Sequence, residues 1–179
     1  MTPHSQKPHA DDSDVCVQCA IITVSDTRTA ETDKSGQLMQ SLLTASGHRI
    51  VHYQIVKDEP AQIAALVTHL SSSDTTQAIL LNGGTGIAPR DTTYDAIVPL
   101  LTKTLPGFGE MFRQLSYAEI GSRAIASRAV GGIRTELQEG RTKHTLLFSV
   151  PGSRKAVELA LKSLILPELI HLTQLLNAS

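Results

Sequence analysis

The sequence predicts an α/β fold with a mixed, mostly parallel sheet and helices on both faces of that sheet. In the first half of the chain, strand-like segments alternate with segments of helical periodicity, a pattern typical of parallel strands joined by right-handed crossovers. In the second half, the strand-like segments 129–133 and 145–150 are separated only by a polar stretch too short for a useful crossover helix. That arrangement favours an antiparallel pair, so the sheet is expected to be mixed.

The β-branched residues of Val15 to Val24 predict the first strand. Cys16 and Cys19 within it are spaced C-x-x-C, which also occurs in redox and zinc sites. Residues three apart on a strand point to opposite faces, and a zinc site needs further ligands. We therefore expect two reduced thiols.

Four more elements complete the first half. Helical spacing of leucines predicts a helix that Ser46-Gly47 closes, and a strand over 49–56 follows. Pro60 opens the next amphipathic helix at a first-turn position. A short buried strand over 78–81 then leads into a glycine-rich stretch.

The second half begins with a predicted helix over 92–101, in which Thr92 and Asp95 have the spacing of a capping box. A second helix passes through Phe108 and Phe112. After the antiparallel pair, Pro151-Gly152-Ser153 caps a last helix, which Pro167 is expected to interrupt or kink.

We expect a single domain over residues 15–179, because the chain can bury one core and no shift in composition divides it. Residues 1–14 are polar and contain two prolines, so a disordered tail is expected there. The formal net charge of −1 gives no whole-molecule attraction to nucleic acid or to a membrane. No apolar run approaches the roughly 20 residues that span a bilayer, which indicates a soluble, cytoplasmic protein.

The stretch from Leu80 to Gly86 is an apolar strand that ends in glycines and precedes a helical pattern headed by Asp91. Glycines let backbone N–H groups approach an anion closely, and the start of the following helix adds partial positive charge. The stretch is not a P-loop, because it lacks the Gly-Lys-Ser/Thr ending, and Pro89 stands where a dinucleotide fingerprint has its third glycine. It predicts either a phosphate site or a strand-to-helix turn without a ligand.

An acidic side chain follows each of the three strands in the first half: Asp26, Asp58 and Asp91. The carboxyl ends of parallel strands converge, and carboxylates gathered there repel one another unless a cation lies between them. Hard oxygen ligands suit Mg²⁺. Alternatively, Asp26 closes an Asx turn, and the other two cap the helices that follow them.

Basic residues give an independent indication of an anion. Arg154 and Lys155 fall in the first turn of a helix, where the macrodipole disfavours cations, and Arg90 lies just before another helix. A bound anion would offset that cost. Together with the glycines and the acidic residues, they predict a phosphorylated ligand with Mg²⁺.

Six ordered motifs resemble one family, the molybdenum-cofactor biosynthesis group that includes MoaB, MogA and the G domains of gephyrin and the plant cofactor protein. The motifs are Thr23-Val24-Ser25-Asp26, Gly83-Gly84-Thr85-Gly86, Pro89-Arg90-Asp91, Pro106-Gly107-Phe108-Gly109-Glu110, Ser127-Arg128-Ala129 and Pro151-Gly152. They extend from about Ala20 to Leu176, and the short ending after Pro151-Gly152 is more similar to MoaB than to MogA.

The resemblance implies a three-layer α/β/α fold, a homo-oligomer (a hexamer or a trimer) and molybdopterin binding at the strand ends. For MogA-like members it also implies Mg²⁺-dependent adenylylation of molybdopterin by ATP. The alternative is a carrier or scaffold that holds molybdopterin without turnover. The partners that the resemblance implies for the protein are molybdopterin, ATP and other cofactor-biosynthesis proteins.

By motif, Asp58 and Asp91 match the two acidic positions that matter for the reaction, as catalytic residues and ligands of Mg²⁺ with ATP. The residue patterns and the resemblance together assign ligand binding to Ser25, Asp26, Gly83, Gly84, Thr85, Gly86, Arg90, Ser127, Arg128, Pro151, Gly152 and Ser153. The chain departs from the family pattern at Lys57, where Pro is frequent, at Asn82, where Thr is usual, and in an apparently longer loop over 134–144.

Overall fold

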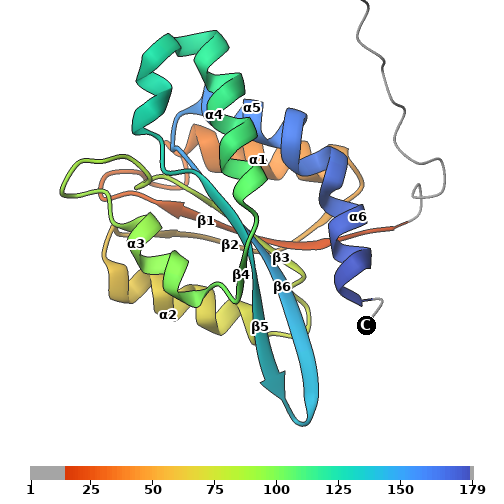
Figure 1. Ribbon diagram of the computed structural model, residues 1–179. Coiled ribbons are helices and arrows are strands. Elements are labelled where there is room, and N and C mark those ends of the chain that lie inside the picture. The colour runs from red at the N-terminus through yellow and green to blue at the C-terminus, as the bar shows by residue number, and fades with distance from the viewer. Residues whose placement is uncertain (1–14, 178–179) are drawn as a thin grey trace, which may run out of the picture.

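A computed structural model describes residues 15–177, which form a six-stranded sheet between two layers of helices (Figure 1). The strand order is β2-β1-β3-β6-β5-β4, with β1, β2, β3 and β6 parallel and β5 antiparallel to both β6 and β4. The strands are β1 Gln18–Val24, β2 Arg49–Val56, β3 Ala78–Asn82, β4 Lys103–Thr104, β5 Val130–Gln138 and β6 Arg141–Val150. The predicted mixed, mostly parallel α/β fold is confirmed. The tail expected over 1–14 lies outside the described residues.

Each face of the sheet has its own apolar core. Helices α1 (Lys34–Ala45), α4 (Pro106–Ile120) and the C-terminal helix cover one face, and α2 (Pro60–Ser71) and α3 (Thr93–Ile97) cover the other (Figure 1). Alternate residues of β1 serve the two cores, because successive side chains of a strand point to opposite faces. The parallel strands therefore have nearly continuous buried apolar sequences, as a sheet covered on both faces requires.

The C-terminal helix runs from Arg154 to Asn177 without a break, as α5 (Arg154–Ala160), a π-helical turn (Leu161–Ile165) and α6 (Leu166–Asn177). Pro167 therefore does not interrupt it. We attribute the π turn just before Pro167 to the missing N–H of that residue, which cannot bond back to the preceding turn. By length and composition alone this helix could cross a membrane. Its inner side chains are buried in the apolar core on one face of the sheet.

The polar stretch 134–144 is not the loop that the sequence predicted. It continues β5 and β6 into a regular hairpin, in which Arg134 pairs with Thr145 and Gln138 with Arg141. The turn consists of Glu139 and Gly140, both at positive φ (47° and 79°), as a tight hairpin turn requires. The prediction failed because this part of the hairpin has polar side chains in place of a buried apolar face.

The helix predicted over 92–101 is also different. Helix α3 has five residues and is followed by a 3₁₀ turn, Val98–Leu100, and by the unpredicted short strand β4. No capping box forms, because the Thr92 hydroxyl donates to Asp58 and Asp95 pairs with Arg128. Both side chains of the expected box are used in contacts between distant segments.

The two cysteines are free thiols, as expected. Cys16 is exposed just before β1, whereas Cys19 is buried in the strand. Burial raises the pKa of Cys19 to about 12, with a smaller contribution from Cys16. Cys19 is therefore protonated and unreactive at neutral pH.

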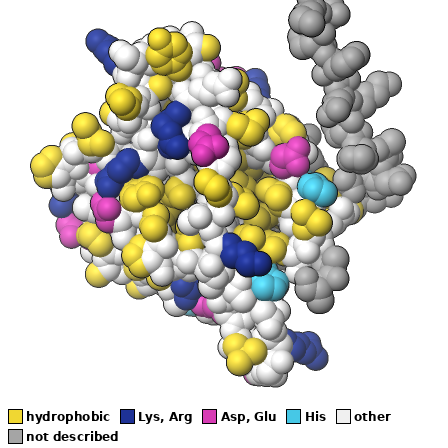
Figure 2. Space-filling view, viewed as in Figure 1, with side chains coloured by type: hydrophobic (Ala, Val, Ile, Leu, Met, Phe, Trp, Pro, Cys, Tyr) yellow, Lys and Arg dark blue, Asp and Glu magenta, His cyan; other side chains and the backbone are white. Residues whose placement is uncertain are grey.

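Large apolar side chains are exposed on α4 and on the 3₁₀ segment Gly121–Ala126 that follows it. They include Met111, Tyr117, Ile120 and Ile125, the last with 87% of its surface exposed. Figure 2 shows further apolar side chains on the same side of the molecule as the β4 edge of the sheet. Of the eight large apolar side chains that are exposed among the described residues, four lie on α4 and the 3₁₀ segment.

Candidate functional site

The register of the parallel strands brings several polar turns together at the carboxyl ends of these strands. Thr23 lies opposite Asn82, Val24 opposite Val56, and Asn82 opposite Val150. The segments that follow these strand ends therefore meet: 25–28, 57–59, 83–91 and 151–153. The convergence expected from the sequence is confirmed.

Close backbone approach explains the glycines after β3. Gly83 and Gly84 have φ values of 101° and 61°. A Cβ atom at Gly83 would lie 2.2 Å from the carbonyl oxygen of Val24. At Gly84 it would lie 2.4 Å from Asp58 Oδ2, and at Gly86 2.6 Å from Asp91 Oδ2. The glycines thus allow Asp58 and Asp91 to pack directly against the loop, one near each end of the segment Gly84–Gly86.

The carbonyl groups of this loop face protein donors. The oxygens of Gly84, Thr85 and Gly86 accept hydrogen bonds from Thr93 N (3.0 Å), Arg128 N (3.0 Å) and Arg128 Nε (2.8 Å). In a trans peptide the N–H of the next residue points the opposite way from the carbonyl. Within residues 15–177, the backbone N–H groups of residues 84–87 donate no hydrogen bond. They form a row of donors of the kind that binds phosphate oxygens.

Asp58 is held rigidly beside this row. Only 7% of its surface is exposed, and its Oδ1 accepts from both Thr92 N (3.0 Å) and Thr92 Oγ1 (2.6 Å). It does not cap α2, whose N-cap residue is Glu59. The carboxylate instead fixes the start of α3, while its Oδ2 lies against Gly84.

Asp91 and Asp26 have more open surroundings. Asp91 is half-buried, and its Oδ2 accepts from Ala88 N (3.1 Å) within the loop; the N-cap residue of α3 is Thr92. Asp26 is exposed and accepts from Asp58 N (3.2 Å). The helix caps that the sequence left open for Asp58 and Asp91 are therefore not formed.

Arg90 pairs with two carboxylates at these strand ends, Asp26 and Glu59. Its Nε lies 2.9 Å from Asp26 Oδ2 and its Nη1 lies 3.1 Å from Glu59 Oε1. The hydrogen bond from Arg90 lowers the pKa of Asp26, and the two carboxylates in turn raise the pKa of Arg90. The sequence argument that a cation must separate the acidic groups is thus met in part by an arginine.

The donor set fits Mg²⁺ only if a ligand contributes oxygens. Among the described residues, no group of three or more His, Cys, Asp or Glu side chains is placed to hold a metal ion. Mg²⁺ commonly binds one or two carboxylates and completes its shell with water and substrate phosphates. Asp58 and Asp91 beside the row of free N–H groups match that mode.

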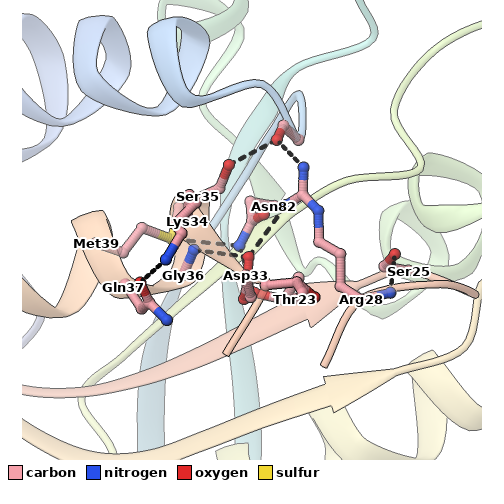
Figure 3. A network of polar contacts seen from close by, with 12 residues as sticks. Thr23, Ser25, Arg28, Asp33, Lys34, Ser35, Gly36, Gln37, Met39 and Asn82 are labelled. Atoms are coloured by element: carbon pink, nitrogen blue, oxygen red, sulfur yellow. Dashed lines mark hydrogen bonds and ion pairs between the residues drawn. The ribbon is translucent and has the colours of Figure 1, made fainter. Parts of the chain in front are cut away.

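A buried polar network that the sequence analysis missed lies next to the site (Figure 3). The Asp33 side chain is 0% exposed and accepts from Thr23 Oγ1 (2.5 Å), Tyr53 OH (2.8 Å) and Gly36 N (3.0 Å), and it pairs with Arg28 (3.1 Å). Burial alone would raise the pKa of Asp33, but these hydrogen bonds and Arg28 lower it below its ordinary value. Asp33 is therefore ionised.

The same network holds the turn before the last helix. Arg28 Nη2 and Ser35 Oγ both donate to the carbonyl oxygen of Gly152, at 2.9 and 2.7 Å (Figure 3). The Ser153 hydroxyl caps the helix by accepting from Ala156 N (3.2 Å), as predicted. The only sequence signal for the network was the N-cap spacing of Asp33 and Gly36 before α1.

The remaining predicted residues have structural partners at the same edge. Ser25 Oγ accepts from the backbone N–H groups of Thr27 and Arg28, so it closes the turn after β1. Ser127 and Arg128 line a groove of about 540 Å³ between α3 and α4.

A larger open hollow of about 1090 Å³ lies at the β5–β6 hairpin, beside the start of β3 and thus at the other end of that strand from the glycine loop. We place the site at the strand ends, where the free N–H groups and carboxylates are.

Comparison with known proteins shows the family of the chain. The family model described as a probable molybdopterin binding domain matches residues 20–171. Molybdenum cofactor biosynthesis protein B of Bacillus subtilis is 52% identical over 171 residues, covering 95% of this chain and 96% of the relative. The protein B of Halalkalibacterium halodurans is 50% identical over 168 residues, covering 93% and 94%.

Solved structures show the same fold. A crystal structure of a molybdenum cofactor biosynthesis protein B matches with a TM-score of 0.84 and 47% identity, over 97% of this chain and 100% of that one. The tungsten cofactor synthesizing protein MoaB from Pyrococcus furiosus matches with a TM-score of 0.79 and 34% identity, over 90% and 97%. The chain therefore belongs to the molybdopterin-binding family of molybdenum cofactor biosynthesis proteins.

Proposed function

We propose that the strand-end site adenylylates molybdopterin with Mg-ATP. An oxygen of the terminal phosphate of molybdopterin attacks the α-phosphorus of ATP. The bond from that phosphorus to the bridging oxygen of the β-phosphate breaks, and pyrophosphate leaves. The products are adenylylated molybdopterin and pyrophosphate.

The observation that carries this proposal is the row of free backbone N–H groups at residues 84–87, flanked by Asp58 and Asp91. Amide donors held in place before the ligand arrives stabilise negative charge without reorganisation at the moment of reaction. Two neighbouring carboxylates have the chemistry to hold the cation that accompanies ATP. One site thus offers both the anion donors and the metal ligands that a nucleotidyl transfer needs.

Asp58 and Asp91 would have different tasks in this reaction. Asp58 is buried and fixed by Thr92, so it provides a rigid ligand. Asp91 lies in the loop and is half-buried, so it can adjust to the phosphates. Mg²⁺ held there would neutralise charge that develops on the phosphoryl oxygens. Ser25, Ser127 and the turn 151–153 remain predicted ligand contacts at the rim.

A molybdopterin carrier without turnover is the second candidate. Two observations favour it: Asp58 Oδ1 is already engaged twice by Thr92, and Asp26 is neutralised by Arg90. Both reduce the negative charge available to a metal. A carrier would still use the N–H row for the pterin phosphate.

One assay separates the two candidates. Purified protein is incubated with molybdopterin, Mg-ATP and pyrophosphatase, and adenylylated molybdopterin is measured by chromatography. We expect product from the wild type, and a loss of at least about a hundredfold in Asp91→Asn, with molybdopterin binding largely retained. Bound molybdopterin without any product from the wild type would support the carrier. Unchanged transfer in Asp91→Asn would remove Asp91 from the mechanism.

We also propose that the protein works as a homo-oligomer, with a hexamer expected from the family resemblance. The exposed apolar side chains Met111, Tyr117, Ile120 and Ile125 support an interface there. Other cofactor-biosynthesis proteins could supply or receive the pterin. Light scattering during size-exclusion chromatography gives the assembly mass, and a monomer at micromolar concentration would reject the oligomer.

A further inference from the structure

Each guanidinium nitrogen of Arg128 donates to an acceptor of the protein. Its Nε donates to the carbonyl of Gly86 (2.8 Å), and its Nη2 to the carbonyl of Asp91 (2.7 Å). Its Nη1 donates to both carboxylate oxygens of Asp95, at 3.0 and 2.8 Å. All three guanidinium nitrogens thus have partners, so most of the hydrogen-bonding capacity of this side chain is directed at the protein and not at a phosphate.

These contacts set the direction of the free N–H groups. Arg128 N binds the carbonyl of Thr85, and Arg128 Nε binds that of Gly86. Each bond fixes one peptide plane, and the N–H groups of Gly86 and Ile87 point away from Arg128 as a result. Arg128 therefore orients two adjacent N–H donors of the predicted phosphate site.

Arg128 is also connected to Asp58 through a single peptide. Its Nη2 holds the carbonyl of Asp91, and the N–H on the other side of that peptide belongs to Thr92. Thr92 N donates to Asp58 Oδ1 (3.0 Å). Arg128 thus binds the carbonyl of the Asp91–Thr92 peptide, and Asp58 binds its N–H on the opposite side.

Two residues of α3 hold Arg128 in this orientation. Asp95 accepts two bonds from the single nitrogen Nη1, and the ring of Tyr94 lies 5.0 Å from the guanidinium carbon. Three nitrogens that reach three different partners, together with stacking on an aromatic ring, suit arginine and not lysine. The Asp95 side chain is 63% exposed and contacts Arg128 from the helix surface.

We propose that Arg128 is a positioning residue, which orients the N–H groups of Gly86 and Ile87 and the Asp91–Thr92 peptide and does not itself bind the phosphate. The proposal rests on the proposed function, because it concerns the same phosphate site. It gives Arg128 a different task from the direct phosphate contact that the sequence resemblance implied.

The test compares Arg128→Lys, which keeps the charge, with Asp95→Asn, which leaves Arg128 intact but removes its anchor. Amide hydrogen exchange is measured in the free protein at Ala88, Asp91 and Thr92, whose N–H groups are bonded within the loop or to Asp58. Binding of inorganic pyrophosphate with Mg²⁺ is measured by calorimetry. Arg123→Lys, an exposed arginine on the neighbouring 3₁₀ segment, is the matched control.

We expect exchange at the loop amides to accelerate about tenfold or more in Arg128→Lys and about threefold in Asp95→Asn. Pyrophosphate binding should weaken in the same order, by about tenfold and about threefold. The double variant should be no weaker than Arg128→Lys alone, since both changes break one unit. Arg123→Lys should behave as the wild type.

A direct phosphate contact predicts the opposite pattern. Lysine would retain much of the affinity as a point charge, and Asp95→Asn would bind pyrophosphate more tightly because Arg128 would be freed; either result overturns the proposal. If the wild type binds no pyrophosphate, the proposed function fails. The exchange data on the free protein still decide whether Arg128 positions the loop, and unchanged exchange in both variants would reject it.

Discussion

Two aspartate–arginine pairs lie at the carboxyl ends of the parallel strands: one has a buried aspartate with a partly exposed arginine (31%), and in the other both side chains are exposed. Asp33 is completely buried and binds Arg28, Thr23, Tyr53 and a helix N–H. Asp26 has 34% of its side chain exposed, and its partner Arg90 has 60% exposed. The first pair joins α1 to the turn before α5. The second pair joins the turn after β1 to the loop after β3, at the surface of the proposed site.

The difference in burial separates scaffold from site. Removing one partner of a buried pair leaves a charge or a hydrogen-bonding group without its partner, which is costly. An exposed pair in water contributes little and can exchange one partner for another. We therefore assign the Asp33 network to holding the strand ends together, and the Asp26–Arg90 pair to the surface of the proposed site.

The largest expected effect is the loss of the Asp33 charge. Asp33→Asn keeps the shape of the side chain but weakens its bonds to Thr23, Tyr53 and Arg28, which should lower the free energy of unfolding by about 3 kcal/mol. Urea unfolding followed by circular dichroism measures this change. A loss below about 1 kcal/mol would show that the network contributes no more than an exposed pair does.

The dependence of stability on pH sharpens the same comparison. The folded protein holds the pKa of Asp33 below its ordinary value, so the charge stabilises the fold above the unfolded pKa of about 3.9. That stabilisation is lost as the pH falls from about 5 through the folded pKa. The difference in unfolding free energy between wild type and Asp33→Asn should therefore be constant near neutrality and shrink below about pH 5.

Subtracting the two proteins isolates Asp33 from other titrating groups. Burial lowers the pKa of His48, so this residue also makes stability depend on pH, but it does so in both proteins. Unfolding curves at several pH values between about 3 and 8 give the difference directly. A difference that stays constant down to pH 3 would contradict the assignment to Asp33.

The sequence predicted the parts of this edge that depend on local signals. The strand over 49–56, the helix start at Pro60 and the Ser153 cap are all confirmed, because each depends on neighbouring residues. The convergence of the acidic turns followed from the parallel topology alone. The functional roles at these positions remain predictions.

Contacts between distant segments could not be read from the sequence. Arg28 and Gly152 are 124 residues apart, and Arg128 reaches Asp91 across 37. In the 134–144 hairpin the side chains of Thr135 and His144 bond across the two strands. Lys143 donates to the carbonyls of Ser71 and Ser73, at and just after the end of α2. Because these residues carry no apolar alternation, their pattern was typical of a loop, although the strands continue there.

The smallest expected effect is at the exposed pair. Asp26→Asn removes one of the two carboxylates that hold Arg90 but leaves the bond from Arg90 to Glu59 in place. We expect no measurable change in urea unfolding, because the pair is solvated and screened by salt.

The affinity for pyrophosphate should change in Asp26→Asn. Because Arg90 is then less restrained and one negative charge fewer lies at the surface of the proposed site, pyrophosphate should bind more tightly, and more so at low salt. Calorimetry at two salt concentrations measures this. If Asp26→Asn instead destabilised the fold as much as Asp33→Asn, the two pairs would serve the same structural role, and burial would not be what separates scaffold from site.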